Sequence, residues 1–76
     1  MSFTPEIWNT MVAMAEETFY SKHEPALPPL YLVLKNSYGQ LNLYKFGVGF
    51  VKGFGDREEL HRWLVENVEE PLEARH

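Results

Sequence analysis

Residues 30–54 read LYLVLKNSYGQLNLYKFGVGFVKGF, and this stretch decides the fold. Runs of leucine, tyrosine, valine and phenylalanine are separated by Asn36-Ser37-Tyr38-Gly39 and by Gly47-Val48-Gly49, which are typical of hairpin turns. The pattern therefore predicts a three-stranded antiparallel meander. Its expected strands are residues 30–35, 40–46 and 50–54.

The two turns set the expected register and faces. A four-residue first turn places Leu34 opposite Leu41 and Leu32 opposite Leu43, so one face is leucine. A three-residue second loop places Phe46 opposite Phe50, whereas a two-residue Gly-Val turn would invert the third strand. If the second loop has three residues, aromatic and basic residues lie together on the face opposite the leucines. These candidate partner-binding residues are Tyr31, Val33, Lys35, Tyr44, Phe46, Phe50, Lys52 and Phe54.

The segments that flank the meander indicate helices. Apolar residues at helical spacing, with Thr4 as a cap and Pro5 at the first position, predict a helix over about 5–20. A stiff, proline-rich connector follows at 21–29. Asp56 and Glu59 have the spacing of a capping box, and Pro71 closes the second helix. The tail at about 72–76 is expected to be frayed.

The predicted fold is therefore α+β, in the order α-β-β-β-α, as a single domain over 1–76. Both helices pack on the leucine face of the three-stranded meander. They leave the aromatic face uncovered, unless the connector at 21–29 or a flipped third strand buries part of it. A chain of 76 residues buries only a small hydrophobic core, and without cysteine it has no disulfides. We therefore expect subunit contacts to provide further stability.

Charge is distributed unevenly. The net charge is −4, yet residues 25–55 contain Lys35, Lys45 and Lys52 and no acidic residue. The simplest interpretation is that strands exclude Asp and Glu. The alternative is a mildly basic sheet that meets an anionic surface.

The sequence contains no strong catalytic, phosphate-binding or metal-binding motif. The glycines from Gly47 to Gly55 lack the spacing of a phosphate-binding loop. Glu58 and His61 form one E-x-x-H without the partners of a di-iron site, and His23 and His76 stand alone. We expect no enzyme activity, no cofactor, no metal site and no small-molecule substrate.

These patterns favour a small non-enzymatic protein–protein interaction module of the accessory-subunit, inhibitor or regulator type. It would bind a protein partner or itself, as a homodimer or as a subunit of a larger assembly. The interface would be the aromatic face or the free edge of strand 30–35. The alternative is an RNA- or single-stranded nucleic-acid-binding protein that uses the same aromatic face.

Membrane attachment is not expected. No apolar run approaches the ~20 residues of a membrane-spanning helix. The first residues lack the basic region of a secretory signal. We therefore expect a soluble protein located in the cytoplasm.

Overall fold

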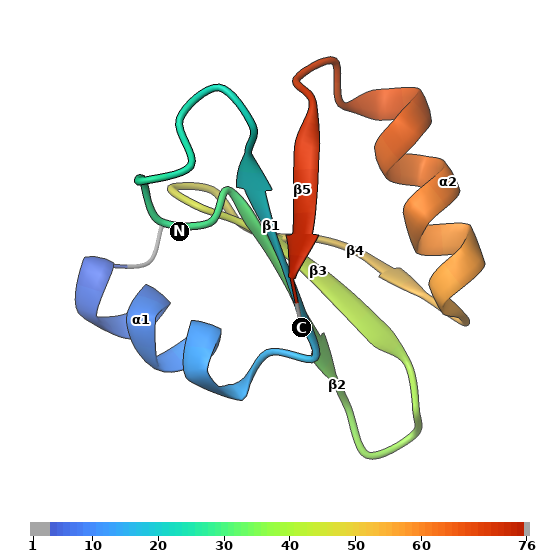
Figure 1. Ribbon diagram of the computed structural model, residues 1–76. Coiled ribbons are helices and arrows are strands. Elements are labelled where there is room, and N and C mark those ends of the chain that lie inside the picture. Colours follow the sequence, from blue (N-terminus) through green and yellow to red (C-terminus); the bar gives the residue numbers. More distant parts are fainter. Residues whose placement is uncertain (1–3, 76) are drawn as a thin grey trace.

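The computed structural model of the chain describes residues 4–75, and within them the chain forms two helices and one five-stranded antiparallel sheet (Figure 1). The α+β class is confirmed. The strands lie in the order β4-β3-β2-β1-β5. The elements are α1 (Pro5–Met14), β1 (Glu17–Ser21), β2 (Tyr31–Lys35), β3 (Leu41–Lys45), β4 (Gly49–Phe54), α2 (Arg57–Asn67) and β5 (Leu72–Arg75).

The first helix is shorter than predicted. Thr4 caps it through its side-chain oxygen, as expected, but α1 ends at Met14 and Ala15 has an extended backbone. Residues 17–20, assigned from sequence to the helix, and Ser21, assigned to the connector, instead form β1 between β2 and β5. Thr18, Phe19 and Tyr20 are residues that strands favour. Phe19 would be buried in either a helix or a strand. Its place in the apolar pattern therefore could not distinguish the two conformations.

The C-terminal segment is also a strand. Residues 72–75 pair with β1 as β5, so the prediction of a frayed tail is wrong for these residues; residue 76 lies outside the described part of the chain. The second helix agrees better. Asp56 caps α2 by accepting the N–H of Glu59 at 2.9 Å, and Leu60 and Leu64 are buried.

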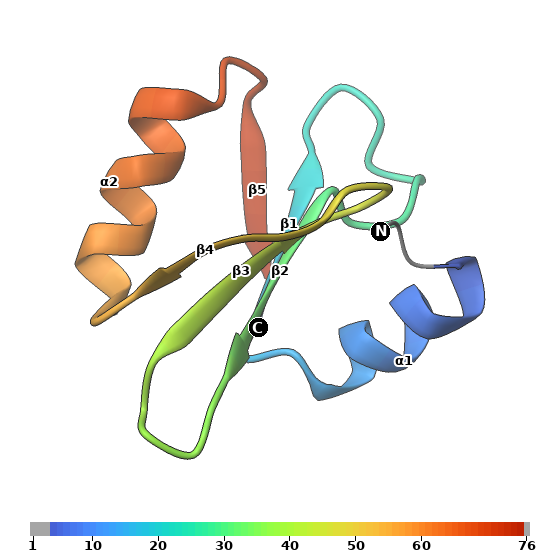
Figure 2. The same cartoon turned by 180° about the vertical axis from the view of Figure 1, so that it is seen from behind.

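The helices lie on opposite sides of the sheet, which contradicts the prediction that both cover one face (Figures 1 and 2). On the α1 side, Trp8 and Met11 pack on Leu32, and the indole N–H of Trp8 donates to the carbonyl of Pro29 at 3.1 Å. The α2 side carries the larger core. Its buried residues are Phe19, Tyr31, Val33, Leu43, Phe54, Leu60 and Leu64.

The first hairpin is shifted by one residue from the predicted pairing. Asn36 and Gln40 pair, and the side-chain oxygen of Asn36 accepts the N–H groups of Tyr38 and Gln40. Gly39 completes this tighter loop with a φ of 83°. Leu43 therefore lies opposite Val33 and not opposite Leu32. A shift of one residue turns a strand over, so leucines and aromatic residues occur on both faces.

The second hairpin differs as well. Its loop is Phe46–Val48, so Tyr44 lies opposite Phe50, and a bulge then brings Lys52 opposite Leu43. Both glycines of the predicted turn have positive φ, 80° at Gly47 and 106° at Gly49, which side chains of other residues disfavour. The turn and its three-residue length agree with the prediction, but its position one residue earlier and the bulge were not predicted.

Candidate functional site

The eight predicted partner-binding residues do not share one face. Tyr31, Val33 and Phe54 are buried beneath α2. The exposed lysines, Lys35 and Lys52, lie on that same side, where Lys52 places its Nζ 5.5 Å from the centre of the Phe54 ring. The remaining residues, Tyr44, Phe46 and Phe50, belong to the α1 side or to the hairpin loop. The prediction of one continuous aromatic face is therefore wrong, because both hairpin registers differ from those expected.

A smaller apolar surface remains around the β3–β4 hairpin. We call Tyr44, Phe46, Val48 and Phe50 the hairpin patch. The last three are 38%, 55% and 57% exposed, while Tyr44 is half-buried. The rings meet edge to face: Tyr44 contacts Phe50 with 5.7 Å between centroids, and Phe46 contacts Trp8 of α1 at 5.5 Å. Large apolar side chains are thus held together and left in contact with solvent.

The patch is uncovered because α1 lies over β2. Trp8 and Met11 reach Leu32 in β2. On the hairpin, the Phe46 ring meets Trp8, and Tyr44 packs against the same cluster. The outer part of the sheet on this side therefore has no helix above it within residues 4–75 (Figure 2).

The two edges of the sheet differ in their protection. β5 has four residues, and Arg75 there pairs with Glu73 and lies 4.0 Å above the ring of Tyr20. β4 has six residues, with Phe50 exposed and Lys52 as its charged residue. On its outer side β4 has no neighbouring strand among residues 4–75. Short, charged edge strands disfavour pairing with another chain, whereas a longer apolar edge strand favours it.

The edge of strand 30–35, predicted as an interface, is not free. This segment contains β2, which lies inside the sheet between β1 and β3. The unpredicted strand β1 covers it, so strand addition there is excluded in this fold. The third strand of the predicted meander is an edge, as expected.

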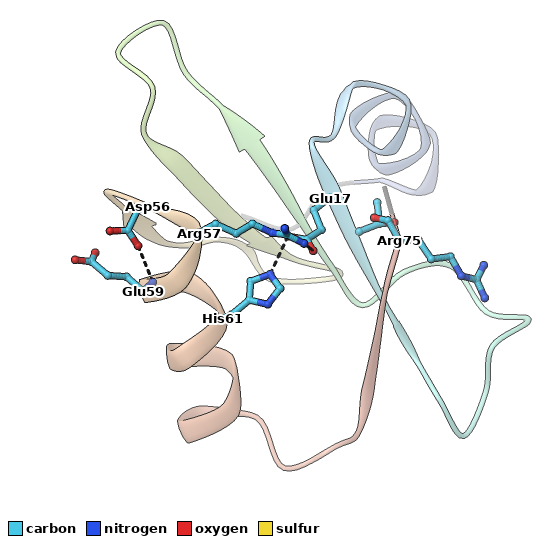
Figure 3. Close-up of polar contacts among 7 residues, drawn as sticks. Glu17, Asp56, Arg57, Glu59, His61 and Arg75 are labelled. Carbon is cyan, nitrogen blue, oxygen red and sulfur yellow. Dashed lines mark hydrogen bonds and ion pairs between the residues drawn. The ribbon is translucent and has the colours of Figure 1, made fainter.

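A charge cluster connects β1 to α2 on the other side of the sheet (Figure 3). Glu17 is 5% exposed, and both of its oxygens are engaged: Arg57 donates from Nη2 at 2.8 Å and from Nε at 3.3 Å, and His61 Nε2 lies 3.0 Å from Oε1. Burial alone would raise the pKa of Glu17, but the hydrogen bonds from Arg57 and His61, with their charges, lower it below its ordinary value. The same pairing raises the pKa of Arg57.

This cluster was not found from the sequence. Glu17 fell within the helix predicted over about 5–20, and His61 was considered only with Glu58. The partners of Glu17 are 40 and 44 residues away, and no short motif connects them. The structure brings them together because β1 and α2 pack around the same core residue, Phe19, whose ring meets that of His61 edge to face.

Two further findings concern residues 4–75. No group of three or more His, Asp or Glu side chains there is arranged to hold a metal ion. Neither of the two helices there has the length and apolar character needed to cross a bilayer.

Comparisons of the chain with protein-family models, with curated proteins and with solved structures found no match. Function is therefore inferred from the chain's own residues.

Proposed function

We propose that this protein is a non-enzymatic protein-interaction module that binds an extended segment of a partner protein along β4 and the hairpin patch. The observation that carries the proposal is the coincidence of exposed apolar side chains with an unpaired strand edge. Phe50 belongs to both, at 57% exposure on a six-residue edge strand. An apolar surface bordered by polar residues is typical of protein contact sites.

Strand addition is the mode that this geometry favours. The backbone of β4 offers hydrogen-bonding groups to an incoming strand, and side chains beside the edge provide selectivity. Phe50 lies on the α1 side and Lys52 on the opposite side. A segment that alternates apolar and acidic residues would place its apolar groups on the hairpin patch and its carboxylates near Lys52. The lack of acidic residues over 25–55 supports an acidic partner.

The charge of β4 favours a different protein over a second copy. Antiparallel pairing of two β4 strands around a two-fold axis would bring the two Lys52 side chains close together. Repulsion between these two lysine side chains opposes association of the two copies. The homodimer predicted from sequence stays a prediction, and we propose the partner complex as the main form. An accessory subunit, inhibitor or regulator would act in this way.

Two observations support the non-enzymatic part of the proposal and the choice of a protein partner. Glu17, the carboxylate most removed from solvent, has both oxygens committed to Arg57 and His61. The nucleic-acid alternative required exposed aromatic rings and lysines on one face. Lys45 and Lys52 lie on the α2 side, where the rings of Tyr31 and Phe54 are buried, whereas the exposed rings of Phe46 and Phe50 belong to the hairpin patch. Base stacking and phosphate contact would thus need opposite sides of the sheet.

A matched pair of variants tests the proposal. Phe50→Ser removes the central ring of the hairpin patch, and Tyr38→Ser removes an aromatic side chain that is 89% exposed in the other hairpin. The tagged wild type and both variants are used to capture proteins from the source cells, and the bound proteins are quantified by mass spectrometry. We expect Phe50→Ser to reduce recovery of a specific partner at least ~10-fold, as for a central interface residue.

The control decides the meaning of the result. Tyr38→Ser should recover the partner as well as the wild type does. Equal recovery with Phe50→Ser and the wild type would contradict the proposal. Light scattering on a sizing column, at several protein concentrations, tests the homodimer separately; a dimer that Phe50→Ser dissociates would assign the patch to self-association.

A further inference from the structure

A groove lies on the α2 side, at the edge of the sheet opposite the hairpin patch. The second half of α2 and strand β5 lie side by side and are joined by a turn (Figure 1). Residues of both elements and of that turn line the groove. Its volume is about 330 Å³. Buried Phe19 and Leu64 form the floor, with Val68, Leu72 and Ala74 around it. A hollow of this size is at the small end of ligand pockets, which span ~300–1,000 Å³.

Side-chain contacts hold one wall of the groove in place beside its floor. The His61 ring, which also lines the groove, meets Phe19 edge to face at 5.6 Å. Its Nε2 lies 3.0 Å from Glu17, which Arg57 holds in turn. The charge cluster therefore fixes one wall, and an incoming group meets a shape already formed in the free protein. Such preorganisation lowers the entropic cost of binding.

The rim of the groove is negative. Glu69 and Glu70 line it, just beyond the C-terminus of α2. The last turn of α2 carries no basic residue, so the partial negative charge of its free carbonyls is not offset there. Between residues 56 and 70 the sequence has six acidic residues against two arginines. Electrostatics at this site therefore favour a cation beside an apolar group.

We propose that this groove is a second docking site, for a segment of a partner protein that presents a large apolar side chain next to a lysine or arginine. The apolar side chain would occupy the hollow above Phe19 and Leu64, and the cation would lie against Glu69 and Glu70. This inference is independent of the proposed function, since the hairpin patch lies at the other edge of the sheet and favours an acidic segment. The chain would thereby connect two partners of opposite charge.

The test uses full-length isotope-labelled protein and a short synthetic peptide of alternating leucine and lysine as the probe. Binding is followed through the backbone amide signals of residues 61–74. Two comparison peptides replace lysine by glutamate or leucine by serine. We expect saturable shifts with the leucine–lysine peptide and a loss of affinity of at least ~10-fold with either replacement.

Variants locate the site. Ala74→Phe should fill the groove, since Ala74 pairs with Phe19 and lies on the same side of the sheet. Glu69→Lys reverses a rim charge. Glu73→Lys is the matched control, because Glu73 pairs with Tyr20 and points to the α1 side. We expect the first two variants to weaken binding and the control to retain it. Phe50→Ser should also retain it, which separates this result from a failure at the hairpin patch.

Three outcomes would overturn the inference. The first is equal binding of the glutamate peptide. The second is wild-type affinity in both Ala74→Phe and Glu69→Lys. The third is an equal loss in Glu73→Lys, which would indicate attraction to the acidic protein as a whole and not to this groove.

Discussion

The two sides of the sheet are covered to different extents, and the difference explains where the protein can bind. On the α2 side, Leu60 and Leu64 close over β3 and β4, and the Glu17 cluster connects α2 to β1. On the α1 side, Trp8 and Met11 close over β2. One helix is about 10 Å wide with its side chains, while five strands ~4.8 Å apart span roughly twice that distance. A single helix per side therefore leaves part of each side open.

The open areas lie at opposite edges and differ in character. The α1 side leaves the hairpin patch beside β4, an exposed apolar surface on a strand whose lysine, Lys52, points to the other side of the sheet. The α2 side leaves the groove beside β5, a concave apolar surface with glutamates at its rim. Placement of the helices on opposite sides thus creates two chemically distinct surfaces in a chain of 76 residues.

The largest expected effect separates two phenylalanines of one strand. Phe54 is 6% exposed under α2, whereas Phe50 is more than half exposed on the α1 side. We expect Phe54→Ala to lower the free energy of unfolding by ~3–5 kcal/mol, because it opens a cavity in the core. Phe50→Ala should cost less than ~1 kcal/mol. Urea denaturation of both variants measures the difference. Similar losses of unfolding free energy would show that side chains are equally well packed on the two sides of the sheet.

Removal of the Glu17 charge tests the connection between β1 and α2. We expect Glu17→Gln to lower the free energy of unfolding by ~1–3 kcal/mol, since a buried carboxylate with charged donors is replaced by a neutral amide. Its exposed neighbour provides the control: Glu16→Gln should change stability by less than ~0.5 kcal/mol. Thermal unfolding at neutral pH compares them. A loss equal in both variants would indicate a general charge effect and no specific role for the cluster.

The pH dependence of stability follows from the lowered pKa of Glu17. A carboxylate whose pKa is lower in the folded state stabilises the fold above its ordinary value of 4.5, and this contribution is lost as the pH falls through the lowered pKa. We expect the stability difference between wild type and Glu17→Gln to be full at neutral pH and to shrink below about pH 4.5. Urea denaturation at a series of pH values measures it. A difference that stays constant down to strongly acidic pH would contradict the ionic origin of the pairing.

The smallest expected effect concerns the helix caps. Asp56 accepts the N–H of Glu59 at 2.9 Å, and Thr4 accepts that of Ile7 at 3.2 Å. We expect Asp56→Ala to cost ~1 kcal/mol, and Thr4→Ala to cost the same or less. Circular dichroism during thermal unfolding compares the two. If Thr4→Ala had the larger effect, α1 would contribute more to stability than its partial cover of the sheet implies.

Local signals predicted the parts of the fold that depend on neighbouring residues. Thr4 and Asp56 are caps in the structure, and Gly39 and Gly47 mark hairpin turns as expected. The existence of three strands over 30–54 was predicted by their composition. Each of these features depends on hydrogen bonds or backbone angles within a few residues.

Errors occurred where distant pairing decides the conformation. Residues 17–21 and 72–75 form β1 and β5 against each other, although they lie at opposite ends of the chain. The hairpin registers depended on one residue of loop length and on a bulge, and these moved Tyr31 and Phe54 from the predicted binding face into the core. Of the predicted site, Tyr44, Phe46 and Phe50 remain in the hairpin patch.

By itself, the sequence determined the helix starts, the hairpin turns and the separation of acidic from basic segments, since these follow from residue type and short-range spacing. Only the tertiary structure decided the sheet order, the side that each helix covers and the partners of Glu17. The physical reason is that strand pairing and burial are settled between segments far apart along the chain. An apolar residue such as Phe19 can be buried equally well from a helix or from a strand. Its packing against β2, α2 and β5 decides which of the two forms.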